Sequence, residues 1–404
     1  MAATSLFWIA AVAAVAPLLA GLVPRRLVPE VVLLLVLGML IGPHVLDWAT
    51  TGGGVELLRE IGLAMLFLLA GYEIEIAEIT GRGGRRALVT WVIGFALALL
   101  VVVLVGLSGR IHAEAAVAIA LSSTALGTLL PILKDGGQLH SPLGAAVLNH
   151  GAYGELCPIV AMAVLLGTRG AFGSIIVLLL FAIGALLVTA VSSRLRGHAG
   201  LAGRVRAGSE TTAQTTVRLV VLLLMIFLVL SVVFDLDVVL GAFAAGFALR
   251  RALPEGDLAL EHKLEGLAFG LLVPIFFVTS GMAIDPAAVA RKPALLVIFV
   301  LLILLIRGGV IFVSSVIERD ADSGRRLYTR RDSLRIALYG ATGLPIIVAV
   351  TSVAVDNGQM TSANASLLVA GGAVTVLLMP MTATLLAPRR QEVEATQDER
   401  PPAG

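Results

Sequence analysis

Glu155 and Arg307 each stand near the middle of a long apolar segment, over 142–167 and 293–317. A charge at the centre of a bilayer costs at least about 2.5 to 3.5 kcal/mol, so such residues are seldom retained without a task. An acid and a base at equal depth predict a charge pair. A permanent salt bridge that fixes packing is the structural alternative, and an ion-binding site is the functional one.

The residues around Glu155 favour ion binding. Gly144, Gly151 and Gly154 allow another helix to approach closely, and Pro158 leaves the Gly154 carbonyl without its helical donor. Carboxylate and free carbonyl oxygens suit Na⁺ or K⁺, and the sequence offers no His and Cys cluster for a transition metal. Glu155 is therefore the predicted site that holds either a monovalent metal ion or a proton, with Gly154 as a candidate ligand.

Two segments contain residues that interrupt helices. In the segment over 114–133, Pro131 should release the carbonyl of Gly127, and in the segment over 332–354, Pro345 should release that of Ala341. Paired interruptions at matching places in two repeats indicate a binding site at the membrane midplane. Simple kinks patched by hydroxyl groups are the alternative. The candidate cation ligands or broken-helix residues are Ser122, Ser123, Thr124, Gly127, Gly154, Ala341 and Thr342.

His150 precedes Glu155 by about a turn and a half. A pH-sensing role is possible for an imidazole at that place, and a hydrogen-bonded polar residue is the alternative. Glu73, Glu75 and Glu78 flank one membrane edge, and we interpret them as interfacial residues and not as ligands. The sequence contains no HExxH helix and no nucleophile constellation, which argues against an enzyme, and nothing in it indicates a cofactor.

The elements that must position these residues are membrane-spanning helices. Hydrophobic residues make up 58% of the 404 and charged residues 14%, a balance that one water-soluble core could not hide. Apolar runs of roughly 18 to 25 residues are long enough to cross a hydrocarbon layer as helices. About thirteen are predicted, at 5–23, 28–46, 57–75, 86–108, 114–133, 142–167, 172–193, 216–234, 237–252, 262–283, 293–317, 332–354 and 362–386.

The basic residues predict the orientation of these spans. Twenty Lys and Arg fall on one side, and only Arg110, Arg169, Arg291 and Lys292 fall on the other. The positive-inside rule then places the N-terminus outside and the C-terminus in the cytoplasm. The short loops hold scattered basic residues and no basic stripe, so we expect no nucleic acid partner.

Three local similarities predict an inverted repeat. Gly38 matches Gly241, Gly71 matches Gly281, and Pro131 parallels Pro345. These matches relate spans seven apart, and an odd shift turns the second half upside down. We expect a transmembrane domain over 1–390, with one repeat at 5–167, a linker helix at 172–193, a second repeat at 216–386, and a disordered cytoplasmic tail at 391–404.

The chain resembles the monovalent cation:proton antiporters of the second family, which includes Kef-type and Nap-type exchangers. The resemblance covers about 5–386 and rests on IGLAMLFLLAGYEIE at 61–75, SSTALGTLLPILKD at 122–135, LGAFAAGFALRR at 240–251, LVPIFFVTSGMAID at 272–285, and LGMLIGP ending at Pro43. It implies an all-α membrane fold with discontinuous crossing helices, a core bundle, a separate dimerisation domain, and elevator-like alternating access. A homodimer in a bacterial inner membrane is also implied.

Two positions depart from the family pattern. The family commonly has an Asp, often after another polar residue, where this chain has Gly154 and Glu155, and many members have Lys where Arg307 stands. Carried over, Glu155 binds the ion and the proton, and Arg307 is its charge partner. One titrating site predicts electroneutral exchange of one Na⁺ or K⁺ for one H⁺. A sodium-coupled symporter of an organic anion on the same architecture is the alternative.

Overall fold

The computed structural model of the chain describes residues 2–22, 28–74, 81–106, 111–135, 137–139, 141–166, 176, 179, 181–184, 186, 214–234, 236–253, 257–319 and 324–387. The first half of the chain forms the helices α1 Ala2–Leu22, α2 Glu30–Ile41, α3 Gly54–Glu73, α5 Arg82–Val105, α6 Ile111–Ser122, α7 Leu126–Asp135 and α8 Pro142–Leu165. The second half forms α11 Thr215–Val233, α12 Val238–Ala252, α13 Leu258–Leu267, α14 Val273–Met282, α15 Pro286–Arg291, α16 Pro293–Leu302, α17 Gly309–Ile317, α18 Arg330–Gly340, α19 Leu344–Asp356 and α20 Ser362–Leu385.

Every one of these helices except the short α15 overlaps a predicted span. Two predicted spans are continuous runs that contain a π-helical turn, η2 Ala268–Leu272 between α13 and α14, and η3 Ile303–Gly308 between α16 and α17. The predicted span at 172–193 lies outside the described residues except at 176, 179, 181–184 and 186. The all-α membrane architecture expected from the apolar runs is confirmed.

Seven helical stretches among the described residues have the length and the apolar composition to cross a bilayer. They are Ala3–Leu22, Arg82–Leu104, Thr215–Val233, Leu258–Met282, Pro293–Ile317, Arg330–Asp356 and Ser362–Leu385. The α2 helix is apolar but shorter, and the span predicted at 114–133 is divided between α6 and α7.

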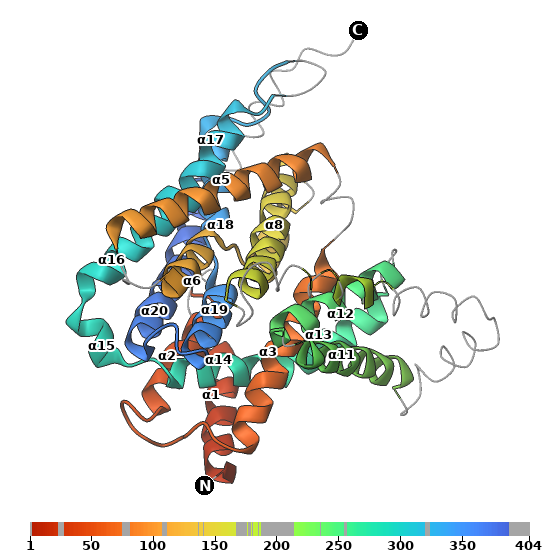
Figure 1. Cartoon of the computed structure of the whole chain (residues 1–404), viewed down its shortest axis with the longest axis vertical. Helices are drawn as coiled ribbons and strands as arrows, with labels where there is room; N and C mark the ends of the chain where they lie inside the picture. The colour runs from red at the N-terminus through yellow and green to blue at the C-terminus, as the bar shows by residue number, and fades with distance from the viewer. Residues whose placement is uncertain are drawn as a thin grey trace, which may run out of the picture.

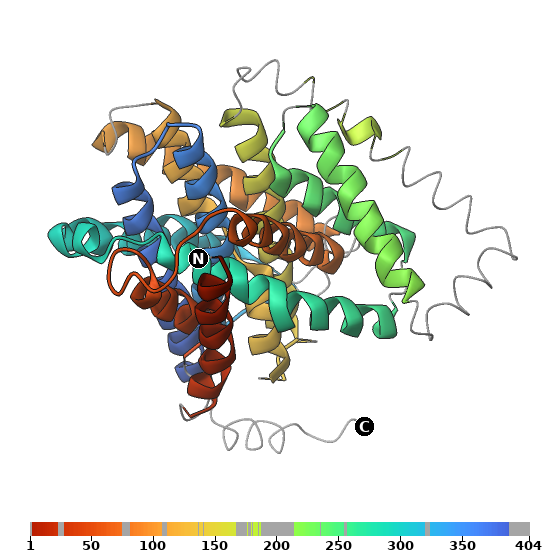
Figure 2. The same cartoon turned by 90° about the horizontal axis from the view of Figure 1, so that it is seen from below.

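The helices pack in two groups (Figure 1). One group, which we call the scaffold, comprises α1, α2, α3, α11, α12, α13 and α14. The other, which we call the crossing bundle, comprises α5 to α8 and α16 to α20. Few elements touch across the boundary, chiefly α8 with α12, α7 with α3, and α20 with α2. Helices α16 and α11 lie at opposite edges of the molecule in Figure 1 and again in the perpendicular view of Figure 2.

Glycines hold the scaffold together. A Cβ on Gly71 of α3 would meet the Phe243 carbonyl of α12, and a Cβ on Gly281 of α14 would meet the Leu35 carbonyl of α2. Such contacts let backbones touch where lipid gives helices no hydrophobic reason to associate. Gly71 and Gly281 are matched positions of the predicted repeat. Gly71 of α3 contacts α12, Gly281 of α14 contacts α2, and α2 and α12 are also matched to each other. This exchange of partners is what the predicted inverted repeat requires of α2–α3 and α12–α14.

Candidate functional site

Two interrupted helices meet in the crossing bundle. Helix α6 ends at Ser122 and α7 begins at Leu126, while α18 ends at Gly340 and α19 begins at Leu344. The Ala125 N–H donates a hydrogen bond to the Thr342 carbonyl across the crossing. The Thr124 hydroxyl donates to the Gly340 carbonyl at 2.6 Å. Each interruption thus supplies partners for backbone groups that the other exposes, as non-helical backbone at membrane depth requires.

The prolines do not break the helices as the sequence predicted. The first interruption begins at Ser123, well before Pro131, which lies inside α7, so Gly127 is a residue of α7 and not of the break. Pro345 lies in the first turn of α19, where a missing N–H removes no helical bond. Ser123, Thr124, Ala341 and Thr342 do lie in the two interruptions.

Helix α8 passes beside the crossing, and Gly154 is its point of contact. The Thr124 N–H donates to the Gly154 carbonyl at 2.8 Å. The sequence predicted that Pro158 leaves this carbonyl without its helical donor, and in the structure the interrupted backbone of the neighbouring helix supplies a donor instead. A Cβ on Gly154 would collide with the Arg307 guanidinium and with the Thr124 side chain.

Arg307 is the largest fully buried side chain among the described residues, at 1% exposure. It lies in the π-helical turn η3, and such turns often occur at functional sites because they redirect a side chain. Its Nε donates to the Thr124 hydroxyl at 3.0 Å, and its Nη2 donates to the His150 carbonyl at 2.8 Å. Arg307 therefore ties α8 to the crossing. Its Nη1 is buried without a hydrogen-bond partner among the described residues.

Glu155 is buried at 3% exposure and forms no ion pair with Arg307 within the described part of the chain. The Glu155 Oε2 is buried and accepts no hydrogen bond from a described residue. The direct pair that equal depth predicted is absent because Arg307 is engaged by the backbone and the hydroxyl of the crossing. A buried carboxylate oxygen with no protein donor is open to a proton or a metal ion.

The group that interacts electrostatically with Glu155 is Glu73. Glu73 is the last residue of α3, and its Oε2 is buried, with Gly127 of α7 beside it. Glu73 was predicted to be interfacial, whereas its carboxylate reaches inward from the scaffold toward α7 of the crossing bundle. No local sequence signal distinguishes it from Glu75 and Glu78, which lie outside the described residues.

Among the described residues, the other predicted site residues form no hydrogen bond with Glu155. The Ser122, Ser123 and Thr342 hydroxyls donate to backbone carbonyls of their own turns, at 3.0, 2.9 and 2.8 Å. The His150 side chain is buried, and its Nδ1 has no hydrogen-bond partner among the described residues. These hydroxyls keep a lone pair free, and what they stabilise in the structure is the interruption itself.

Known proteins resemble both the sequence and the fold. The family model described as "Sodium/hydrogen exchanger, transmembrane" matches residues 10–388. YjbQ of Bacillus subtilis (strain 168) is 24% identical over 293 residues, which cover 69% of this chain and 47% of that protein. The Na(+)/H(+)-K(+) antiporter GerN of Bacillus cereus is 25% identical over 264 residues, which cover 63% of this chain and 65% of GerN. This chain thus spans about half to two thirds of these relatives.

A solved structure has the same fold. The sodium proton antiporter MjNhaP1 from Methanocaldococcus jannaschii, determined at pH 8, superimposes with a TM-score of 0.67. The match covers 95% of this chain and 97% of that chain at 16% sequence identity, so it bears on the fold.

Proposed function

Since the chain belongs to the transmembrane sodium/hydrogen exchanger family, we propose that it exchanges Na⁺ or K⁺ for H⁺ across a membrane. As with other members of that family, its work is transport and not enzymatic catalysis. The proposal rests on one observation. The Glu155 carboxylate is buried beside the two interruptions, and one of its oxygens accepts no hydrogen bond from a described residue.

Metal ion and proton compete for this carboxylate in the proposed cycle. A cation bound at Glu155 is also attracted by the Glu73 carboxylate, which interacts electrostatically with Glu155. When a proton neutralises Glu155, the cation loses its main ligand and leaves. Hard oxygen ligands of this kind suit Na⁺ and K⁺.

The proposed stoichiometry is one cation for one proton. An arginine keeps its charge in proteins, and Arg307 is held by Thr124 and His150, so it balances charge without carrying a proton. Glu155 alone then exchanges a cation for a proton, and no net charge is moved across the membrane in one cycle. A membrane voltage, worth about 2.3 kcal/mol per charge per 100 mV, leaves such a cycle unbiased. Cation-driven voltage in proteoliposomes would contradict this stoichiometry.

Alternating access is proposed to occur by movement of the crossing bundle against the scaffold. Glu155 belongs to the crossing bundle and Glu73 to the scaffold, and few elements join the two groups. We further propose a homodimer in a bacterial inner membrane, with the N-terminus outside, and the repeats and the tail divided as the sequence predicts.

The test is cation-induced dissipation of a pH gradient in everted membrane vesicles. Glu155→Gln keeps the size of the side chain and removes its ability to bind a cation in exchange for a proton, so exchange should disappear. Glu265→Gln, at an exposed position of α13, is the matched control and should exchange normally. Undiminished exchange by the Glu155→Gln protein would overturn the proposal.

A further inference from the structure

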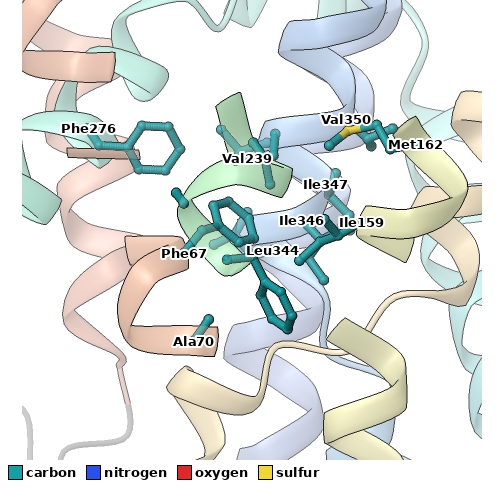
Figure 3. Packing of buried hydrophobic residues seen from close by; sticks show 14 of the residues in the cluster. Phe67, Ala70, Ile159, Met162, Val239, Phe276, Leu344, Ile346, Ile347 and Val350 are labelled. Atoms are coloured by element: carbon teal, nitrogen blue, oxygen red, sulfur yellow. The ribbon is translucent and has the colours of Figure 1, made fainter. Parts of the chain in front are cut away.

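An apolar layer separates Glu155 from one end of the interface between scaffold and crossing bundle. Figure 3 shows the scaffold residues Phe67 and Val239 in one buried cluster with Ile159, Ile347 and Val350 of the crossing bundle. The side chains of all five are at most 1% exposed to solvent. Ile159 follows Glu155 by one turn of α8, and Ile347 and Val350 follow the interruption before α19. The layer therefore lies on the side toward which α8 and α19 run.

Beyond this layer a polar contact joins the two groups. The Arg59 Nη1 of α3 donates to the Ser352 hydroxyl of α19 at 3.3 Å. The same guanidinium pairs with Glu56, one turn earlier in α3, with Nη2 to Oε1 at 2.6 Å. Arg59 lies fourteen residues before Glu73, which is roughly 21 Å along a helix, so this contact and the Glu73 carboxylate stand at opposite ends of the interface.

One acidic residue from each group is bonded to the Arg59 contact, Glu56 to Arg59 and Asp356 to Ser352. Ser352 also donates to the Asp356 carboxylate at 3.4 Å, and Asp356 interacts electrostatically with Asp237, the residue that caps α12. Glu56 and Asp237 belong to the scaffold side, and Asp356 to the crossing bundle. The like charges of Asp237 and Asp356 favour separation of the two groups, and the bond from Arg59 to Ser352 opposes it.

We propose that Arg59 is a gating residue, whose bond to Ser352 closes the ion pathway at this end and must break once in every exchange cycle. The inference rests on the proposed function, because a gate has meaning only in a protein with alternating access. In the described conformation the Arg59 end is closed by the contact and by the apolar layer behind it. Opening at this end requires α19 to move away from α3.

Cysteine labelling tests the gate without measuring transport. Cys157 is replaced by Ser, and Val350→Cys is introduced behind the gate. A membrane-impermeant maleimide is then applied from each side of the membrane in turn. Adding Arg59→Ala should raise the labelling rate from one side only, roughly threefold, as the loss of one partly exposed ion contact predicts. Arg59→Lys should restore part of the protection.

Arg291→Ala is the matched control, because Arg291 also pairs with an acid, Asp285 at the N-cap of the same short helix α15, and makes no contact with α19 that the structure describes. It should leave the labelling rate unchanged. If the protein with Arg59→Ala is labelled at the same rate as the protein that retains Arg59, the proposed gate is wrong. A faster rate from both sides would also overturn it, because it would indicate general loosening.

A second experiment locks the gate. Arg59→Cys and Ser352→Cys are combined in the Cys157→Ser background and joined by a short bifunctional maleimide. The joined protein should lose cation/proton exchange, whereas each single-cysteine protein treated with the same reagent should keep it. Full exchange by the joined protein would overturn the gate. Absence of exchange in the Cys157→Ser parent would instead count against the proposed function, and the labelling result would still decide the gate.

Discussion

The Arg307 guanidinium donates a hydrogen bond to the backbone carbonyl of His150 at 2.8 Å. This bond attaches the only buried charge of η3 to the helix that carries Glu155, at a point more than a turn before the carboxylate. The arginine thus acts on the position of α8.

Loss of Arg307 should destabilise the protein as well as impair exchange. In Arg307→Gln the Thr124 hydroxyl and the His150 carbonyl both lose a charged donor, and each hydrogen bond of this kind contributes about 1.5 to 3 kcal/mol. Thermal unfolding in detergent should show a clearly lower Tm. Arg218→Gln, at an exposed position of α11, should not change the Tm. Equal melting of the Arg307→Gln and native proteins would contradict the structural role.

Gly154→Ala should be poorly tolerated. The added methyl group would run into the Arg307 guanidinium and the Thr124 side chain, and overpacking of this kind costs about 1 to 3 kcal/mol. Gly94→Ala in α5 is the matched control, because a Cβ there meets open space. Tm and exchange rate should fall for the first variant and not for the second. If both variants behave alike, the packing at Gly154 is looser than described.

Glu73→Gln should weaken the binding of cation and proton alike, because the Glu73 charge attracts both to Glu155. The variant removes one negative charge near Glu155, so KM for the cation should rise roughly tenfold, equivalent to about 1.4 kcal/mol, with kcat little changed. Glu60→Gln, at an exposed position on the same helix, is the control. An unchanged KM would mean that Glu73 does not contribute to cation binding.

Gly246→Ala should separate two scaffold helices. A Cβ at this position would meet the Leu68 carbonyl of α3, and backbone cannot yield as a side chain can. Gly266→Ala in α13, where a Cβ meets nothing, serves for comparison. We expect reduced yield of folded protein and a lower Tm for the first variant alone, measured by size-exclusion chromatography and thermal unfolding. Normal folding of the Gly246→Ala protein would argue that the two helices can move apart.

The sequence predicted the helices well because apolar length is a direct signal in a membrane protein. It also placed Glu155 and Arg307 at one depth. Depth, however, does not determine which side of a helix a residue faces. In η3 every neighbour of Arg307 is apolar or glycine, so no periodic pattern could reveal a π-helical turn or its effect on direction. Arg307 therefore binds Thr124 and the His150 carbonyl, and it does not form the ion pair with Glu155 that equal depth predicted.

The interruptions show a similar limit. Proline is a strong local signal, and it drew the predicted breaks toward Pro131 and Pro345. The actual first break at Ser123 to Ala125 is maintained by partners more than two hundred residues away, such as the Gly340 carbonyl for the Thr124 hydroxyl. Contacts between distant segments cannot be derived from one sequence. Glu73 was missed for the same reason, since its nearness to Glu155 arises only when α3 meets α7.

The glycine contacts of the scaffold have a mechanical consequence. Because backbone rests directly on backbone at Gly71 and Gly281, the fit between those helices does not depend on rotamers that thermal motion can change. Such a joint behaves as a stiff frame. In the proposed cycle, bending of this frame absorbs little of the displacement of the crossing bundle, so the movement is transmitted to the far end of the interface.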